Sequence, residues 1–327
     1  MSSIIHSAII GLAVADALGV PVEFEDRSKL AADPVTDVRG YGTYNQPPGT
    51  WSDDSSLTFC LADSLVDGYN LVDMARKFVA WRNAEIWTPH GSVFDIGMTT
   101  HRAIGILSEI LVSGDLESLE ELHWEADEYT NGNGALMRIL PLYFAIHELS
   151  LEEQFDRIWK VSALTHGHIR SALCCFYYLR FFHQIVSKKT KEEAYTITNY
   201  EFTAFLKQKE VAYGEQQLFS RILSGAIAEL PEEAIASDGY VLHSLEASLW
   251  SLLRNKDYPA TILAAINLGE DTDTTAAIVG ALAGALYGFS DIPSHWKKTL
   301  VKYKEISALC DQLAAEYLDY TSASLDL

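Results

Sequence analysis

The stretch that decides the fold is residues 269–288, GEDTDTTAAIVGALAGALYG. Its glycines Gly280, Gly284 and Gly288 recur every four residues, a spacing that places them along one face of an α-helix. A stripe of small residues of this kind predicts close packing against a second helix. Because the apolar part is too short to span a bilayer, we expect this contact in the core, beneath the acidic residues that precede the helix.

Helical periodicity continues along the rest of the chain. The best strand-like alternation is the short stretch Val35–Val38, the polar stretch Lys188–Asn199 predicts an exposed excursion, and the acid-rich stretch Asp115–Glu128 predicts a solvated face or loop. The sequence therefore predicts an all-α fold, a compact multi-helix orthogonal bundle forming one domain over residues 1–327. Apolar spacing places its helices at Ile4–Leu18, Ser55–Val66, Leu71–Trp81, Ile96–Val112, Ala135–His147, Leu151–Leu164, Ile169–Val186, Glu215–Glu229, Tyr240–Leu253, Pro259–Leu268 and Thr272–Tyr287.

The composition indicates which partners and which cellular compartment to expect. The 327 residues include 24 Lys and Arg against 45 Asp and Glu, a net charge of −21, so a nucleic acid, which needs a basic face, is not expected as a partner. The apolar N-terminal segment contains Asp16 and lacks a basic start, which predicts a buried helix, with no signal peptide and no membrane span. The cysteines show no CxxC spacing, which favours buried thiols in a cytoplasmic protein; they are Cys60, Cys174, Cys175 and Cys310.

Two acidic clusters are the strongest candidates for chemistry, Thr50–Ser55 and Gly269–Thr275. Each fits an ordinary helix cap, with hydroxyl and carboxylate groups at the first turn. However, no Lys or Arg lies between Arg39 and Arg76, or between Lys256 and Lys297, so neither cluster has a local counterion. A divalent cation would relieve the repulsion, and these hard oxygen donors suit Mg²⁺ or Mn²⁺ better than Zn²⁺.

Three further motifs are compatible with a ligand site. Residues 130–135, TNGNGA, place two glycines before an expected helix, as in a phosphate cradle or a plain Asn-Gly turn. His166, in the sequence THGH, fits a loop histidine that makes a hydrogen bond better than a metal ligand. The acids Asp16, Glu23 and Asp95 lie in or beside apolar stretches, where a carboxylate needs a partner or a chemical role.

Taken in order, these motifs resemble the ADP-ribosylglycohydrolase family, which includes the dinitrogenase reductase-activating glycohydrolases. The resemblance covers roughly Ile4 to Phe289, with Ala15 where the family often has Gly and Ser at positions 52 and 55 where Thr is commoner. The motifs that carry it are Asp16-x-x-Gly19 with Glu23, Ser52-Asp53-Asp54-Ser55, Asp95-Ile96-Gly97, Gly132-Asn133-Gly134 with Met137-Arg138, Thr165-His166, and Gly269–Thr274 followed by the glycine stripe.

The resemblance implies a cleft with a binuclear centre of two divalent cations, Mg²⁺ or Mn²⁺. The implied metal ligands are Ser52, Asp53, Asp54, Asp271, Asp273 and Thr274. The implied substrate contacts are Thr130, Asn131, Gly132, Asn133 and His166, with Gly132 and Asn133 at the diphosphate of ADP-ribose. Glu23, on a mobile segment over the site, and Asp95 would be the catalytic acids.

The activity implied is metal-dependent hydrolysis of the glycosidic bond between ADP-ribose and a modified residue or small acceptor, which releases ADP-ribose. The partner would be an ADP-ribosylated protein or an ADP-ribose conjugate, and the acceptor linkage stays open among arginine, serine, an O-acyl group and a base. Two alternatives remain at this point: a catalytically inactive ADP-ribose-binding or structural member of the same fold, and a metal-dependent hydrolase of another substrate, such as a phosphoester.

Overall fold

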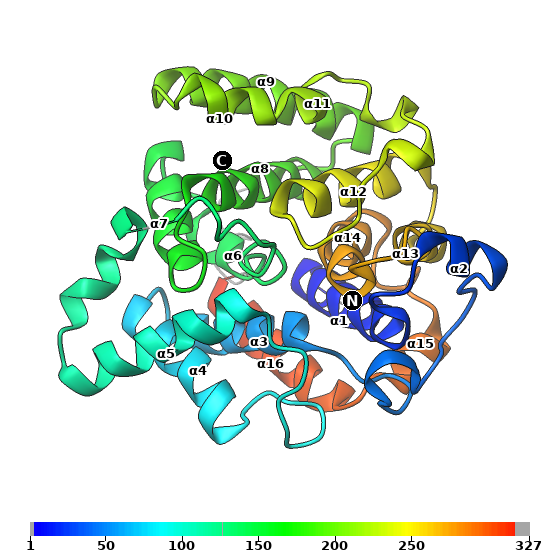
Figure 1. Ribbon diagram of the computed structural model, residues 1–327, viewed down its shortest axis with the longest axis horizontal. Helices are drawn as coiled ribbons and strands as arrows, with labels where there is room; N and C mark the ends of the chain where they lie inside the picture. Colours follow the sequence, from blue (N-terminus) through cyan, green and yellow to red (C-terminus); the bar gives the residue numbers. More distant parts are fainter. Residues whose placement is uncertain (1–2, 126, 318–327) are drawn as a thin grey trace.

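Helices α1 (Ile4–Gly19) and α14 (Thr272–Tyr287) lie side by side through the centre of the computed structural model, which describes residues 3–125 and 127–317 (Figure 1). Glycine residues allow the backbones of these two helices to approach closely. A Cβ atom added at Gly284 would lie 2.0 Å from the Ser7 carbonyl oxygen, and one at Gly280 would lie 2.6 Å from the Gly11 carbonyl oxygen. The stripe predicted from residues 269–288 therefore packs in the core, and its partner is the N-terminal helix.

The central helix α1 is almost entirely apolar. With the 3₁₀ turn η1 (Val20–Val22), it is long and apolar enough to cross a membrane, but 89% of its apolar stretch is buried inside the protein. That burial is typical of a core helix, as the sequence predicts. Asp16, in the last turns of α1, is completely buried.

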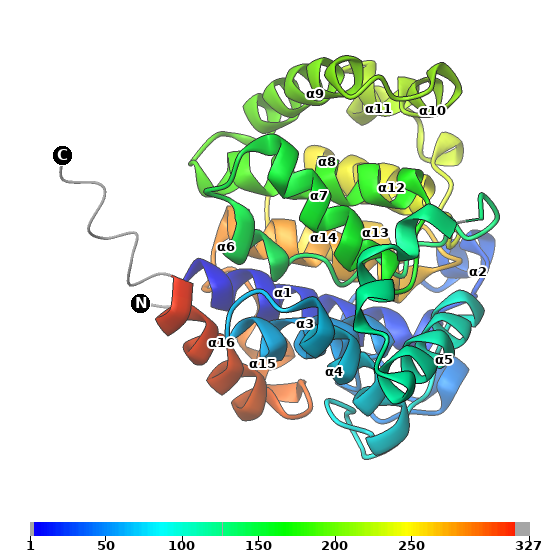
Figure 2. The same cartoon turned by 90° about the vertical axis from the view of Figure 1, so that its left-hand side faces the viewer.

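The remaining helices cover the central pair on both sides (Figure 2). On one side α8 (Ile169–Val186), α12 (Val241–Arg254) and α13 (Tyr258–Ile266) pack near α14, with α9 (Lys191–Gln208) outside α8. On the other side lie α3 (Asp53–Leu65), α4 (Leu71–Ala84), α5 (Met98–Ser113) and α16 (Tyr303–Tyr317). Shorter elements complete the fold: α2 (Arg27–Ala32), η2 (Gly42–Tyr44), η3 (Leu116–Glu120), η4 (Leu122–Glu125), α6 (Leu142–Ile146), α7 (Leu151–Ala163), α10 (Tyr213–Leu218), α11 (Ser220–Leu223), η5 (Ile227–Glu229), η6 (Glu232–Ala234) and α15 (Ser294–Thr299).

The all-α prediction is confirmed: the described ranges contain sixteen α-helices and no β-strand. Val35–Val38, the best strand candidate, is irregular. Lys188–Asn199 is no excursion, because α9 begins at Lys191 after a Thr190 capping box and buries Ala194 on its inner face. The charged residues there form the outer face of an amphipathic helix, which a polar average over the stretch does not distinguish from a loop.

Two other segments differ from their predicted helices. Over Ala135–His147 only Leu142–Ile146 is α-helical, and the residues before it form successive turns that end at Pro141. Glu215–Glu229 is broken into the short elements α10, α11 and η5, with Gly225 at φ +78° between the last two. In both segments a loop conformation interrupts an apolar spacing that periodicity alone assigns to one helix. The acid-rich stretch Asp115–Glu128 contains η3 and η4, and position 126 lies outside the described residues.

Candidate functional site

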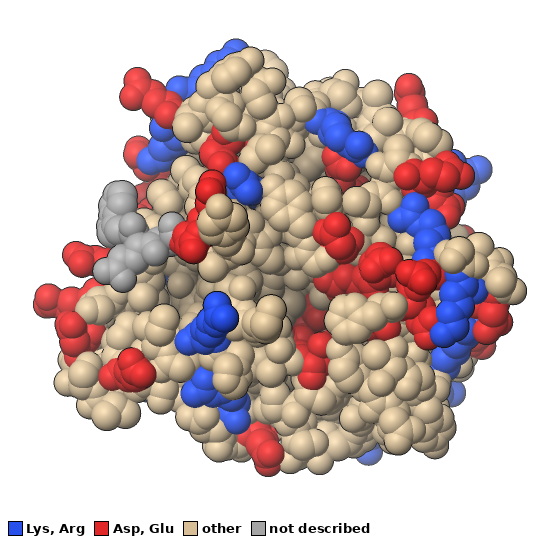
Figure 3. Space-filling view, viewed as in Figure 1, with Lys and Arg blue, Asp and Glu red and all other residues tan. Residues whose placement is uncertain are grey.

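A cleft of about 390 Å³ opens where the N-termini of α3 and α14 face five loop segments, which contain Glu23, Asp95, Gly132, His166 and Gly239. Acidic side chains gather beside the hollow on the face shown in Figure 3. The cleft brings together residues from six of the sequence motifs, with no Lys or Arg among its described lining residues. Those of its residues that belong to the sequence motifs are Glu23, Asp53, Asp95, Gly97, Gly132, Asn133, Gly134, Met137, His166, Asp271 and Thr274.

The two acidic clusters meet at the floor of the cleft. Ser52 caps α3, since its Oγ accepts from the Asp54 backbone N–H at 3.3 Å, and the same hydroxyl donates to Asp54 Oδ2 at 2.9 Å. From α14, Thr274 Oγ1 donates to Asp54 Oδ2 at 3.2 Å. One carboxylate oxygen therefore joins the first turns of two helices that are far apart in the sequence.

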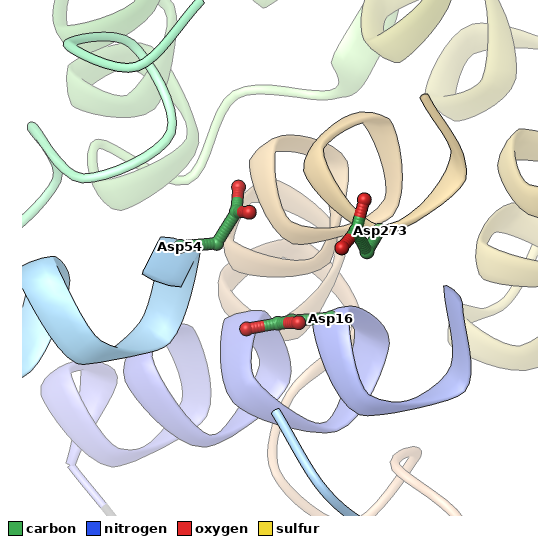
Figure 4. Close-up of side chains that lie close together, drawn as sticks. All are labelled: Asp16, Asp54 and Asp273. Atoms are coloured by element: carbon green, nitrogen blue, oxygen red, sulfur yellow. The ribbon is translucent and has the colours of Figure 1, made fainter. Parts of the chain in front are cut away.

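Asp16 fixes the start of α3 from a different helix (Figure 4). Its carboxylate accepts from the Ser52 backbone N–H at 3.0 Å and from the Ser55 backbone N–H at 3.0 Å, and the Ser55 hydroxyl donates to it at 2.5 Å. These are N–H groups that a helix start leaves without an intrahelical partner. The buried acid in α1 thus has a positioning role, and it lies beside Asp54 and Asp273.

The donor set fits divalent cations. Asp16, Asp54 and Asp273 offer carboxylate oxygens within 4.8 Å of one another, and so do Glu23, Asp271 and Asp273. Within the described part of the chain, four buried carboxylate oxygens of these two groups accept no hydrogen bond: Glu23 Oε2, Asp54 Oδ1, Asp271 Oδ1 and Asp273 Oδ2. Buried carboxylates without a hydrogen bond or a counterion are costly, and a hard divalent cation would satisfy them.

Burial dominates the electrostatics of these acids. It raises the pKa of Asp53, Asp54 and Asp273 well above the usual carboxyl range, and the neighbouring negative charges raise it further. Burial likewise raises the pKa of Asp16 to about 7, against the hydrogen bonds that lower it. Burial and the charges of Asp95 and Asp271 raise the pKa of Glu23 to about 10. In the absence of a cation the folded site therefore favours protonated acids.

We expect the metal-free protein to lose stability between pH 6.5 and 8.5. A carboxyl whose pKa is raised by folding favours the folded state at low pH, and this stabilisation is lost as the pH rises through the pKa of the folded form. Asp16, with a pKa of about 7, completes its loss near the lower end of this window, whereas Glu23, with a pKa of about 10, continues to lose its contribution throughout the window. Thermal unfolding in EDTA should show a falling midpoint, and added Mn²⁺ should raise the midpoint most at the upper pH. Equal midpoints with EDTA and with excess Mn²⁺ at pH 8.5 would contradict a metal contribution to stability.

Asn133 orients one of these acids. Its Nδ2 donates to Asp271 Oδ2 at 2.7 Å and to Ser244 Oγ at 2.9 Å, while its backbone N–H donates to the Gly239 carbonyl at 3.0 Å. All of its N–H donors are thus used within the protein. In this structure Asn133 therefore positions Asp271, and its expected contact with the diphosphate stays a prediction, since Gly132, Asn133 and Gly134 all line the cleft.

Thr130 and Asn131, two of the expected substrate contacts, do not line this cleft. Thr130 Oγ1 donates to the Asp127 carbonyl at 2.7 Å, and Asn131 Nδ2 donates to the Glu128 carbonyl at 2.6 Å. Both side chains fold back on their own loop. Their role in the structure is to shape the turn that presents Gly132 and Gly134.

Arg138 lies beneath that turn as a fully buried cation. Its guanidinium donates to the Gly134 carbonyl and, at 3.1 Å, to the Val161 carbonyl, so it ties the loop to the end of α7. Burial lowers its pKa to about 10. Burial, followed by the charge of Arg138, lowers the pKa of His166 to about 3, so this histidine is neutral at physiological pH. The sequence shows Arg138 only as part of a motif, with nothing to indicate its burial.

The glycine loop gives a direct test of ligand binding. A Cβ atom at Gly132 would lie 3.2 Å from His166 Nε2, and φ at this position is not positive, so a side chain would crowd the cleft without straining the backbone. We expect Gly132→Val to weaken ADP-ribose binding at least tenfold in calorimetry, with little change in the melting temperature. A variant that melts early yet binds ADP-ribose normally would show that the loop is only a turn.

Glu23 and Asp95 lie close to each other in the lining of the cleft. Glu23 is buried, in a segment held by two backbone hydrogen bonds, from Phe24 N to the Glu270 carbonyl at 2.7 Å and from Glu270 N to the Glu25 carbonyl at 2.9 Å. Asp95 is half-buried, at φ +53°, and accepts from the Tyr44 hydroxyl. The structure therefore brings both expected acids to the cleft, together with a tyrosine that the sequence did not single out.

Comparison with known proteins agrees with this geometry. The model of the ADP-ribosylglycohydrolase family matches residues 2–322. ADP-ribosylarginine hydrolase Tri1 of Serratia proteamaculans is 34% identical over 313 residues, which cover 94% of this chain and 77% of that protein. ADP-ribosyl-[dinitrogen reductase] glycohydrolase of Rhodospirillum rubrum is 26% identical over 326 residues, 94% of each chain. A solved structure titled "ADP-ribosylglycohydrolase-related protein complex" superposes with a TM-score of 0.77 and 28% identity, over 96% of this chain and 98% of that one. With its family match across nearly the whole sequence, the chain belongs to the ADP-ribosylglycohydrolase family.

Proposed function

We propose that the protein hydrolyses the N-glycosidic bond between ADP-ribose and an arginine side chain of a modified protein, with the help of two divalent cations, Mg²⁺ or Mn²⁺. The observation that carries the proposal is the convergence of the two acidic clusters, with four unpartnered carboxylate oxygens, beside a glycine loop in one cleft. Relatives named for ADP-ribosylarginine hydrolysis, 34% and 31% identical, support the arginine linkage.

The residues present would hold the cations through oxygen. The candidate ligands are Ser52, Asp53, Asp54, Asp271, Asp273 and Thr274. When bound, the cations would supply positive charge and Lewis acidity toward the ribose hydroxyls and a water molecule. The protein has a net charge of −21, and the described lining residues of the cleft include no Lys or Arg. The positive charge of the cations would therefore be what allows the cleft to bind a diphosphate.

Side chains and backbone of the protein itself would transfer the proton and bind the two parts of the substrate. In the reaction the bond from the anomeric carbon to the guanidine nitrogen breaks and a water oxygen bonds to that carbon. The water gives up one proton, and the departing nitrogen keeps the electron pair and gains one proton, so the proton count is unchanged. Glu23, whose pKa burial raises to about 10, would hold a proton near the departing nitrogen. Asp95 would pair with the guanidinium of the acceptor. Neutral His166 and the Gly132–Gly134 backbone would line the ADP-ribose side.

The test is a panel of substrates with defined linkages. ADP-ribosylarginine, ADP-ribosylserine, O-acetyl-ADP-ribose and an ADP-ribosylated base would each be incubated with Mn²⁺, with Mg²⁺ and with EDTA, and released ADP-ribose measured by chromatography. We expect release from ADP-ribosylarginine with metal, and loss of that release in EDTA. ADP-ribose binding without release from any linkage would instead indicate an inactive binding protein. Hydrolysis of phosphoesters alone would indicate a different hydrolase.

A further inference from the structure

One short turn holds both acids at the mouth of the cleft. Within η2, Tyr44 Oη donates to Asp95 Oδ1 at 2.6 Å, and Thr43 Oγ1 donates to the Glu23 backbone carbonyl at 2.6 Å. Two consecutive residues therefore contact two acids that come from distant parts of the chain. Neither contact uses a carboxylate oxygen of the two acidic groups that could hold cations, since Thr43 binds the backbone carbonyl of Glu23.

The turn adopts a backbone that few residues tolerate. Tyr41, Gly42 and Asn45 all have positive φ, at +68°, +54° and +53°. A Cβ atom at Gly42 would lie 1.8 Å from the Pro21 carbonyl oxygen, so glycine is required where the turn packs on η1. Left-handed backbone at non-glycine residues persists only where the surrounding structure fixes it, and such positions gather at functional sites.

The tyrosine hydroxyl orients the Asp95 carboxylate. Asp95 itself has φ +53°, and its side chain is half-buried at the cleft. The Tyr44 ring packs on Phe94, with ring centroids 5.3 Å apart, which fixes the position of the hydroxyl from the other side. A hydroxyl that donates to one carboxylate oxygen fixes the orientation of that carboxylate and leaves its second oxygen for another partner.

We propose that Tyr44 is a positioning residue that acts through Asp95, by orienting the Asp95 carboxylate toward the acceptor end of the cleft. The inference rests on the proposed function for its effect on catalysis, while the pairing itself rests on the hydrogen bond and the ring contact. It assigns Tyr44 to recognition of the acceptor and leaves ADP-ribose binding to the opposite wall of the cleft.

The first test compares two tyrosines of the same turn. Tyr44→Phe removes the hydroxyl and keeps the ring on Phe94, whereas Tyr41→Phe, at a side chain that is 59% exposed, is the matched control. We expect Tyr44→Phe to lower kcat/KM for ADP-ribosylarginine about tenfold, the effect of one hydrogen bond to a charged group, with unchanged affinity for ADP-ribose. Tyr41→Phe should alter neither. Equal effects of the two variants, or an equal loss of ADP-ribose affinity in Tyr44→Phe, would overturn the proposal.

The second test asks whether Tyr44 acts through Asp95. In an Asp95→Gly background, where glycine suits the left-handed backbone, Tyr44→Phe should cause little further loss of kcat/KM. The wild type, the two single variants and the double variant would also be compared by thermal unfolding. We expect Tyr44→Phe to lower the melting temperature less in the Asp95→Gly background than in the wild type. Additive effects in both measurements would overturn the pairing. If the wild type cleaves no ADP-ribosylarginine, the proposed function fails, and the unfolding measurements still decide the Tyr44–Asp95 coupling.

Discussion

Asp273→Asn is expected to lower the rate of ADP-ribose release by about 1,000-fold, the loss typical of removing one preorganised electrostatic group. Asp273 is the residue shared by the two groups of converging carboxylates, so its replacement disturbs both candidate cation positions at once. Its Oδ1 accepts from the Thr274 backbone N–H at 2.9 Å, and its Oδ2 accepts no hydrogen bond within the described structure. The amide keeps the size and the first contact, and it removes the charge. Steady-state release from ADP-ribosylarginine at limiting Mn²⁺ measures the effect.

The same substitution should stabilise the metal-free protein. Burial and the charges of neighbouring acids raise the pKa of Asp273 well above its usual range, so an ionised carboxylate at this position opposes folding near neutral pH. In EDTA at pH 8 we expect Asp273→Asn to melt at a higher temperature than the wild type. The rise in melting temperature that Mn²⁺ gives the wild type should shrink in the variant. Activity and stability thus change in opposite directions, which a general defect in folding does not produce.

Glu270→Gln provides the matched control, because Glu270 lies three residues before Asp273, in the loop that leads into α14, and its side chain is exposed. This control should keep its turnover and its response to Mn²⁺. Near-normal turnover of Asp273→Asn at limiting Mn²⁺ would show that Asp273 is no ligand. An equal loss in the Glu270 control would attribute the effect to the loop as a whole.

The fold was largely predictable because its strongest signals are local. The glycine stripe of residues 269–288 predicts a close helix contact, and the structure has that contact with α1. The wrong predictions arise where the spacing of apolar residues does not report the environment of a side chain. In α9 a polar outer face conceals a buried inner one, and the turns that precede α6 depend on Arg138, whose contacts cross from the glycine loop to α7. The spacing of apolar residues along the sequence does not predict such a contact.

The site was predictable as a set of residues, but its internal assignments were not. Missing counterions indicate that Asp54 and Asp271 need a cation or a partner, and this follows from charge alone. That Asn133 directs its amide to Asp271 depends on how a loop meets α14, which residue types do not encode. Tyr44 could not be predicted, because a single tyrosine in an irregular segment belongs to no periodic pattern. Its pairing with Asp95 depends on left-handed backbone at Asp95 itself and in the turn that carries Tyr44.

Gly284→Ala is expected to destabilise the fold by about 3 kcal/mol or more, at the upper end of the cost of overpacking a core. The added Cβ would lie 2.0 Å from the Ser7 carbonyl oxygen and 3.3 Å from Gly11 Cα, and both of these atoms belong to the backbone of α1. A backbone atom cannot turn aside as a flexible side chain can, so the two central helices must separate. Because α1 carries Asp16 and α14 carries Asp273, separation would also disturb the acidic site. Urea unfolding followed by circular dichroism measures the change in the free energy of unfolding.

Gly105→Ala is the matched control for this prediction, since Gly105 is also inside a helix, α5, and its added Cβ would meet only Arg82 Nη1, at 3.7 Å. There the substitution should raise the free energy of unfolding by up to about 1 kcal/mol, because alanine favours a helix interior over glycine. The two variants make the same chemical change and gain the same helix propensity, so the difference between them isolates the contact of α1 with α14. If Gly284→Ala were as stable as Gly105→Ala, the two helices would be able to move apart at little cost. The glycine stripe would then reflect something other than close packing.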